Sequence, residues 1–151
     1  NLFNTYLPMD GEMSIRPEYM DGYTNIDGKL VKTTEFNPNI AWTAGSMISN
    51  IDDLKVWVRE LGTGSLLSKK SFAELNTFIP ILMGYPLYFG LGVSNFKGSV
   101  GYHGAINGYN TSIYYNQLYK FTFVITCNNS TNFSEEADKI YTALLKGIYD
   151  L

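Results

Sequence analysis

The fold is decided by the stretch Tyr102-His103-Gly104-Ala105-Ile106-Asn107-Gly108-Tyr109, residues 102–109 of the chain. Its Asn107-Gly108 dipeptide accepts the positive φ angles that a tight hairpin turn requires. We therefore predict that a strand over residues 99–104 pairs with a strand over residues 111–115 across this turn. The two glycines of the stretch also let a backbone or a ligand approach where a Cβ atom would clash.

Short strand-like runs surround this hairpin and predict an antiparallel sheet. β-Branched and aromatic residues dominate these runs, which are bounded by Gly-rich or Asn-rich turns. The predicted strands cover residues 88–93, 99–104, 111–115 and 121–127. Cys127 ends the last run and is predicted to be a small buried apolar residue. The following Asn128-Asn129-Ser130 predicts a loop.

Two helices are predicted before the sheet and one after it. Ser49 is the expected N-cap of the first helix and Gly62 its end. The second begins at Ser68 and ends at Pro80, and the third begins after Ser134. Each helix carries apolar residues at helical spacing. They are Ile51, Leu54, Trp57, Val58 and Leu61 in the first, Phe72, Leu75 and Ile79 in the second, and Ala137, Ile140, Tyr141, Leu144 and Ile148 in the third.

The element order predicts an α+β chain that forms a single partial domain. Residues 1–48 are loop-rich, with many Gly and Pro residues and little periodicity. A helical segment over 49–80, antiparallel strands over 88–127 and a C-terminal helix over 134–151 follow. A chain of 151 residues buries about 70% of its unfolded surface, which is enough for one core but not for two.

Charge and composition argue against several classes of function. The net charge of −3 comes without any cluster of Lys and Arg, so no surface for nucleic acid is expected. No apolar run approaches the roughly 20 residues of a membrane helix. One cysteine and one histidine cannot supply the three or four ligands of a zinc site. We therefore expect no metal, no cofactor and no nucleic-acid partner.

Four segments, in order, resemble the C-terminal part of the serine β-lactamase and penicillin-binding-protein family. This family includes class C β-lactamases, D-alanyl-D-alanine carboxypeptidases and related esterases. The strongest match is Ala44-Gly45-Ser46-Met47-Ile48-Ser49-Asn50-Ile51-Asp52-Asp53-Leu54, which is similar to the family's AGGM-x-S-T-x-x-D-L segment. The others are Asn4-Thr5-Tyr6-Leu7-Pro8, the stretch from Asp21-Gly22-Tyr23 to Asp27-Gly28-Lys29, and Tyr88-Phe89-Gly90-Leu91-Gly92-Val93. The resemblance covers nearly the whole chain but only about the second half of a family member.

The family's third motif, Lys/His-x-Gly on an edge strand, is followed by a glycine six positions after its first residue. Counting back from Gly108 makes Tyr102-His103-Gly104 the motif, with Tyr in the Lys or His position. The alternative puts His103 in that position and Ala105 where the motif glycine belongs. We prefer the first register because it keeps both glycines. The resemblance makes Tyr102 and His103 the candidate catalytic residues.

The resemblance also implies the chemistry, which is acyl transfer through a nucleophilic serine. Ala105 would donate its N–H to the oxyanion, while Gly104 and Gly108 would leave room for the substrate. The family's Ser-x-x-Lys and Tyr-x-Asn motifs belong upstream of Asn1, so this chain alone is expected to be inactive. Ser94-Asn95-Phe96-Lys97 matches the first pattern but lies between strand-like runs. We interpret that match as a coincidence.

Three interpretations remain open at the level of sequence. The first is a C-terminal segment of a serine hydrolase that cleaves an amide, an ester or a β-lactam. The second is a non-catalytic relative that binds cell-wall peptide or sugar, and the third is a purely structural domain. A small-molecule or peptide substrate is expected in the full-length protein, and an unpaired sheet edge could lead to self-association. The resemblance alone implies an extracellular or cell-envelope location.

Overall fold

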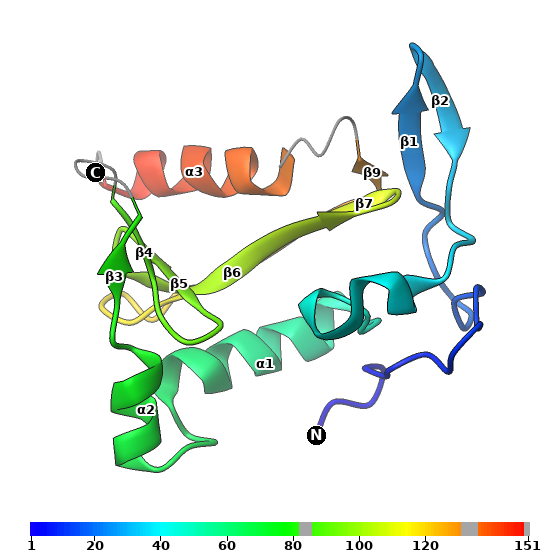
Figure 1. Cartoon of the computed structure of the whole chain (residues 1–151). Coiled ribbons are helices and arrows are strands. Elements are labelled where there is room, and N and C mark those ends of the chain that lie inside the picture. The colour runs from blue at the N-terminus through cyan, green and yellow to red at the C-terminus, as the bar shows by residue number, and fades with distance from the viewer. Residues whose placement is uncertain (82–85, 131–135, 150–151) are drawn as a thin grey trace. The chain divides into compact units, whose positions relative to one another are not determined.

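The computed structural model describes residues 1–81, 86–130 and 136–149 of the chain. Its helices are α1 (Ile51–Thr63), α2 (Lys69–Leu75) and α3 (Glu136–Tyr149), preceded by the 3-10 helix η1 (Pro38–Ala44) (Figure 1). Six strands form one sheet in the order β3-β4-β5-β6-β7-β8. Their bounds are β3 Ile79–Pro80, β4 Leu87–Phe89, β5 Ser94–Phe96, β6 Ser99–Ile106, β7 Tyr109–Asn116 and β8 Thr122–Cys127. The α+β class predicted from the sequence is confirmed.

A second, three-stranded sheet has the order β2-β1-β9. Its strands are β1 (Tyr23–Ile26), β2 (Lys29–Lys32) and β9 (Asn129–Ser130). β1 is antiparallel to β2 and parallel to β9. The sequence predicted a loop-rich segment over residues 1–48 without these two strands, and it predicted a loop at Asn129-Ser130, where the structure has a strand. Asp27 and Gly28 form the turn between β1 and β2, with φ angles of 52° and 79°. Such a pair is a hairpin signal, and here it decides the structure although the short strands on either side alternate only weakly.

The predicted hairpin at Asn107-Gly108 is confirmed. β6 and β7 are neighbours in the sheet and are joined by these two residues alone. Gly108 has a φ angle of 80°, whereas Asn107 is not among the described residues with a positive φ, so only the second turn residue uses the left-handed conformation. Because the turn is so short, it fixes the register of the two strands.

The predicted strand over residues 88–93 is broken in the structure. β4 ends at Phe89, and the N–H of Gly90 then donates to the carbonyl oxygen of Val93 across a tight turn. Gly92 in this turn has a φ angle of 73°. β5 begins only at Ser94, so the aromatic and apolar run spans a strand end and a turn rather than one strand.

The helix boundaries differ from the prediction at three places. Asn50, not Ser49, caps α1, because its Oδ1 accepts from the N–H of Asp53 at 2.9 Å. Gly62 lies inside α1, and the left-handed residue after the helix is Gly64. Ser68 caps α2 as predicted. Ile79 and Pro80, however, belong to β3, because α2 already ends at Leu75.

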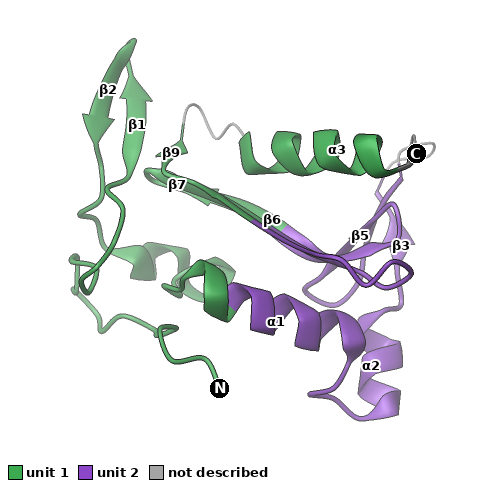
Figure 2. Ribbon diagram, turned by 180° about the vertical axis from the view of Figure 1, so that it is seen from behind, with its two compact units in different colours: residues 1–53, 103–112, 125–151 green, residues 54–102, 113–124 purple. Residues whose placement is uncertain are grey.

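The chain divides into two compact units, coloured separately in Figure 2. Unit 1 comprises Asn1–Asp53, His103–Ser112 and Ile125–Leu151, and unit 2 comprises Leu54–Tyr102 and Ile113–Val124. In unit 2 the core is made of buried apolar residues from α1, β5, β6, β7 and the turn before β5. They are Val58, Val93, Phe96, Val100, Tyr114 and Tyr115.

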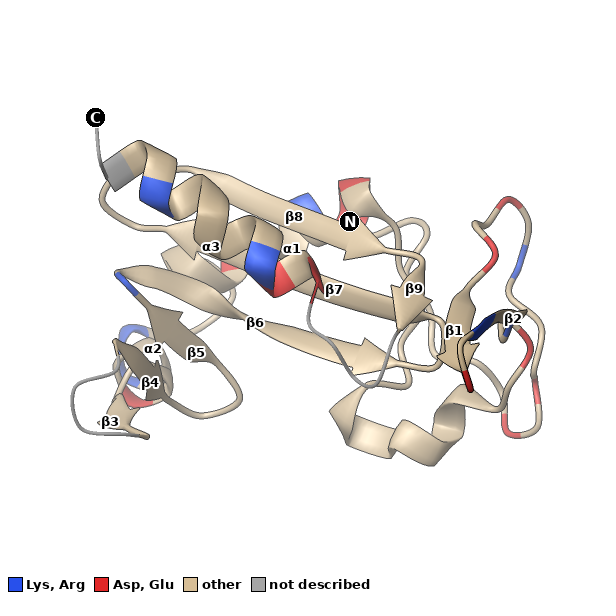
Figure 3. Ribbon diagram, turned by 90° about the horizontal axis from the view of Figure 1, so that it is seen from above, with Lys and Arg blue, Asp and Glu red and all other residues tan. Residues whose placement is uncertain are grey.

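In unit 1, α3 packs through Ala137, Tyr141 and Leu145, which are at most 1% exposed. The predicted stripe was partly wrong, because Ile140 and Leu144 are each more than 40% exposed. The predicted start of this helix at residues 134 and 135 lies outside the described residues. Acidic side chains occupy its first turn and Lys146 its last turn (Figure 3), an arrangement that stabilises the helix dipole. No helix in the described part of the chain is long and apolar enough to span a membrane.

Candidate active site

β6 extends beyond the strand that covers one of its edges. β5 pairs with β6 only through Ser94 with Gly101, Asn95 with Val100 and Phe96 with Ser99. The turn before Ser94 ends this pairing, whereas β6 continues to Ile106. The residue pairs between β5 and β6 therefore end at Gly101.

The N–H of Ala105 is directed away from β7, on the side of β6 that pairs with β5 farther along the strand. In a hairpin with a two-residue turn, the residues that flank the turn bond to each other, here Ile106 and Tyr109. Backbone groups alternate between the two edges along a strand, so those of Gly101 and Ala105 are directed away from β7. Gly101 uses that direction to pair with Ser94. The pairs between β5 and β6 do not include Ala105, so its N–H is the candidate donor to a substrate oxygen.

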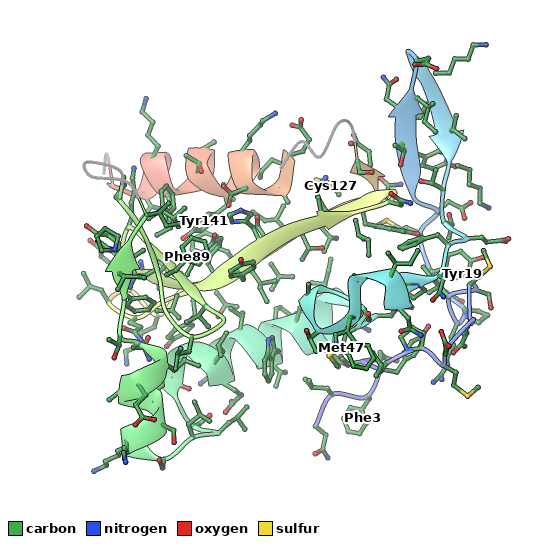
Figure 4. The ribbon with its side chains drawn as sticks, in the orientation of Figure 1. Phe3, Tyr19, Met47, Phe89, Cys127 and Tyr141 are labelled. Carbon is green, nitrogen blue, oxygen red and sulfur yellow. The ribbon has the colours of Figure 1, made fainter. Side chains whose placement is uncertain are left out.

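Tyr102 is 44% exposed and lies one residue beyond the end of the pairing with β5. Its ring contacts the ring of Phe89 on β4 edge-on, with centroids 5.8 Å apart and an angle of 77° between the planes. Figure 4 labels Phe89, which lies on β4. An edge-on aromatic contact of this kind orients the phenol ring.

His103 projects to the opposite face of β6, because side chains alternate along a strand. Its Nδ1 lies 3.6 Å from the Oδ1 of Asp138 on α3. The hydroxyl of Ser112 on β7 donates to the same oxygen at 3.4 Å. His103 thus belongs to a polar contact between the hairpin and α3, within unit 1.

The two glycines of the predicted motif have different surroundings. A Cβ atom on Gly104 would meet no atom of the described residues within 4 Å. A Cβ atom on Gly108 would lie 2.9 Å from the Cα of Gly22 and from the Oγ1 of Thr33. The N–H of Gly108 also donates to the Ser130 hydroxyl at 2.8 Å. The fold itself requires Gly108, whereas the packing of the described residues does not require Gly104.

The Ser94-x-x-Lys97 pattern lies on β5 and the turn that follows it, not on a helix. Ser94 is fully buried, and its hydroxyl donates to the carbonyl oxygen of Gly101 at 3.0 Å. Lys97 occupies the turn with a φ angle of 50°. The two side chains therefore lack the shared helix face of a serine nucleophile and its lysine base.

Cys127 is half-buried, and burial raises the pKa of its thiol. A raised pKa lowers the thiolate fraction near neutral pH, so this residue is a poor nucleophile. In the described part of the chain, no group of three or more His, Cys, Asp and Glu side chains could hold a metal ion.

Asp53 connects two of the segments that resemble the family. Its carboxylate accepts from the N–H of Phe3 at 3.3 Å, the N–H of Asn4 at 2.7 Å and the hydroxyl of Thr5 at 2.8 Å. The Thr5 hydroxyl is also 2.8 Å from that of Ser49. Sequence reasoning missed this cluster because no spacing rule connects Thr5 with Asp53. The only signal was that both lie in family-like segments.

We predict that Asp53 makes stability depend on acidic pH. Burial raises the pKa of its carboxyl, but the hydrogen bonds from Thr5, Asn4 and Phe3 outweigh burial and lower the pKa. Because the folded-state pKa is below the unfolded one, the stabilisation is complete above about pH 4 and is lost as pH falls through the folded-state pKa. Urea unfolding across acidic pH should show a flatter pH dependence for Asp53→Asn than for the parent. Equal pH dependence in the two proteins would refute this role.

The fold is that of known amidases and penicillin-binding proteins. A D-stereospecific amidohydrolase from Streptomyces sp. aligns with a TM-score of 0.80 and 24% identity, over 92% of this chain and 42% of that one. A D-amino acid amidase from Ochrobactrum anthropi SV3 aligns with a TM-score of 0.75 and 18% identity, over 99% and 47%. A penicillin binding protein from Bacillus halodurans aligns with a TM-score of 0.72 and 17% identity, over 95% and 45%. No protein-family model and no curated protein matches the sequence.

The chain therefore has the fold of the serine β-lactamase and penicillin-binding type, as the sequence motifs predicted. It spans less than half of the length of each of these solved structures. Identities below 25% establish the shared fold and leave the reaction to be argued from the site.

Proposed function

We propose that the chain is the C-terminal part of a serine hydrolase that works by acyl transfer. A serine encoded upstream of Asn1 attacks the substrate carbonyl, an acyl-enzyme forms as the leaving group departs, and water then releases the acid. The present chain supplies one wall of the active site and, without the serine, has no turnover. The cell envelope or the extracellular space remains its expected location.

The observation that carries this proposal is the direction of the Ala105 N–H, which is turned away from β7 and is not among the pairs of β6 with β5. Attack on a carbonyl develops negative charge on its oxygen, and a fixed N–H donor stabilises that charge. A donor on a strand is held rigidly by the sheet, and the two-residue turn beside it fixes its register. Gly104 precedes it and carries no side chain that would keep an acyl group away from the strand.

Within this reaction class we propose an amide substrate whose acyl part is a D-amino acid. The D-stereospecific amidohydrolase and the D-amino acid amidase support this choice by their names. Tyr102 supports it by chemistry, because a neutral phenol offers one hydrogen bond where a lysine offers a full positive charge to a carboxylate. A simple amino acid amide has no carboxylate that needs such a charge.

The test is hydrolysis by the full-length protein, assayed with D-phenylalanine amide, L-phenylalanine amide, a p-nitrophenyl ester and a chromogenic cephalosporin. We expect release of ammonia from the D-amide at a kcat/KM above that for the L-amide. Hydrolysis of only the ester or the cephalosporin would retain acyl transfer but refute the amide. Binding of cell-wall fragments without any turnover would favour a non-catalytic relative instead.

The register of the third motif yields a separate prediction. In the full-length protein, Tyr102→Phe should slow acylation about fivefold, because one hydroxyl contact is worth about 1 kcal/mol. His103→Ala should change acylation little, since the imidazole contacts Asp138 on the other face of β6. Stopped-flow acylation rates would compare the two variants, with circular dichroism confirming that both are folded. A folded His103→Ala protein that loses acylation beside an unaffected Tyr102→Phe protein would favour the alternative register.

A further inference from the structure

Unit 1 exposes four large apolar side chains along one short stretch of structure. We call Leu7, Ile40, Trp42 and Met47 the apolar patch. Their exposed fractions are 60%, 83%, 74% and 64%. A tryptophan exposed to this extent is unusual in a folded protein, and neighbouring exposed apolar residues commonly mark a surface that another chain covers.

Backbone hydrogen bonds bring the members of the apolar patch together. Tyr6 and Ile48 exchange two of these bonds, each 3.0 Å long, which places Leu7 opposite Met47 on one face of the pair. The N–H groups of Gly45 and Ser46 donate to the carbonyl oxygen of Trp42. These bonds close the end of η1 immediately before Met47.

A side-chain contact attaches η1 to the N-terminal segment. The side chain of Asn39, next to Ile40, donates to the carbonyl oxygen of Pro8 at 3.5 Å. Figure 4 shows Met47 near η1, with Phe3 on the adjoining N-terminal segment.

Trp42 also has an unfavourable backbone conformation. Its φ of 44° and ψ of −132° interrupt the helical angles of η1. A residue other than glycine in this region is strained, and such strain is commonly found where a protein contacts a ligand or a partner. The residue with this conformation is 74% exposed, so little packing within the described residues offsets the strain.

We propose that the apolar patch is the surface against which the upstream part of the same polypeptide packs, the part that carries the nucleophilic serine. This inference rests on the proposed function. The solved structures of this fold are more than twice as long as the present chain. Hydrogen bonds to Asp53 from Phe3, Asn4 and Thr5 fix the segment that leads to Leu7 in the apolar patch.

The methionines of the chain provide the test. Met13 and Met20 are 51% and 56% exposed and lie outside the apolar patch, whereas Met47 is 64% exposed within it. In native full-length protein treated with hydrogen peroxide, Met47 should oxidise at least about tenfold more slowly than Met13 and Met20. Peptide mass spectrometry measures the three rates in one sample, and the rates should become equal in concentrated urea.

Oxidation of Met47 as fast as Met20 in the native full-length protein would overturn the inference. Protection that disappears on dilution would overturn it too, since it would indicate a second copy on the apolar patch. Met47→Glu should lower the unfolding temperature of the full-length protein, and the matched Met20→Glu should not. If Met47→Glu fails to fold, the oxidation rates of the three methionines in the parent protein still test whether the apolar patch is covered.

The outcome separates this inference from the proposed function. Acylation of an upstream serine together with rapid Met47 oxidation would contradict this inference and leave the proposed function intact. Slow Met47 oxidation in a protein that no acylating reagent labels would contradict the proposed function and leave this inference intact. A reading frame without residues upstream of Asn1 would overturn both.

Discussion

Replacing Gly104 by valine in the full-length protein is expected to lower the acylation rate by at least about a hundredfold. The branched side chain would stand on β6 immediately before Ala105 and keep the substrate carbonyl from the Ala105 N–H. Loss of one such donor in other acyl-transfer enzymes costs about 3 kcal/mol of transition-state stabilisation. The rate is measured by single-turnover labelling with a fluorescent penicillin or a fluorophosphonate.

The same variant should fold normally in the 151-residue chain, because a Cβ on Gly104 meets no described atom within 4 Å. Gly104→Ala is the graded control, and it should reduce acylation less than valine does. Full acylation activity in Gly104→Val would contradict an acyl group lying against this strand. A large loss of stability in the isolated chain would also contradict the open surroundings of Gly104.

The second prediction with a large effect concerns the stability of the fold. It changes Gly101, which lies three residues before Gly104 on β6. A Cβ on Gly101 would overlap the carbonyl oxygen of Ile113 on β7 and crowd the Cα of Tyr114. Both neighbours are backbone atoms that can move only if the sheet distorts. We expect Gly101→Ala to lower the free energy of unfolding by about 3 kcal/mol, at the upper end of the usual cost of overpacking.

Chemical denaturation of the 151-residue chain measures this loss, with Gly104→Ala as the matched control on the same strand. The two alanine variants should differ by most of the predicted amount. Equal midpoints would mean that β6 does not approach β7 as closely as the structure has it.

The sequence predicted the parts of the fold that have strong local signals. The Asn107-Gly108 dipeptide correctly predicted the β6–β7 hairpin, although only Gly108 of the two residues has the positive φ that was expected of both. Ser68 correctly predicted the cap of α2. The run over residues 88–93 was misread because its composition resembles a strand. The turn that breaks it is local, with a hydrogen bond from Gly90 to Val93 and a positive φ at Gly92, so Gly92 was the turn signal that the prediction did not use.

The candidate site was predictable to a different degree. Tyr102 and Ala105 could be selected as candidates from the sequence, because the spacing between the first motif position and Gly108 identifies the strand on which both residues lie. The sequence could not say that β5 ends opposite Gly101, although this end determines whether the Ala105 N–H is covered. Nor could it connect Asp53 with Thr5, which are 48 residues apart and meet only after folding.

The central claim is that this chain completes the active site of a serine acyl-transfer enzyme. Its most direct test is mass spectrometry of the full-length protein after incubation with a mechanism-based acylating reagent, followed by peptide mapping. We predict one covalent adduct, on a serine encoded upstream of Asn1, and its loss in Gly104→Val. The absence of any adduct, or an adduct on a serine within residues 1–151 such as Ser94, would contradict the claim.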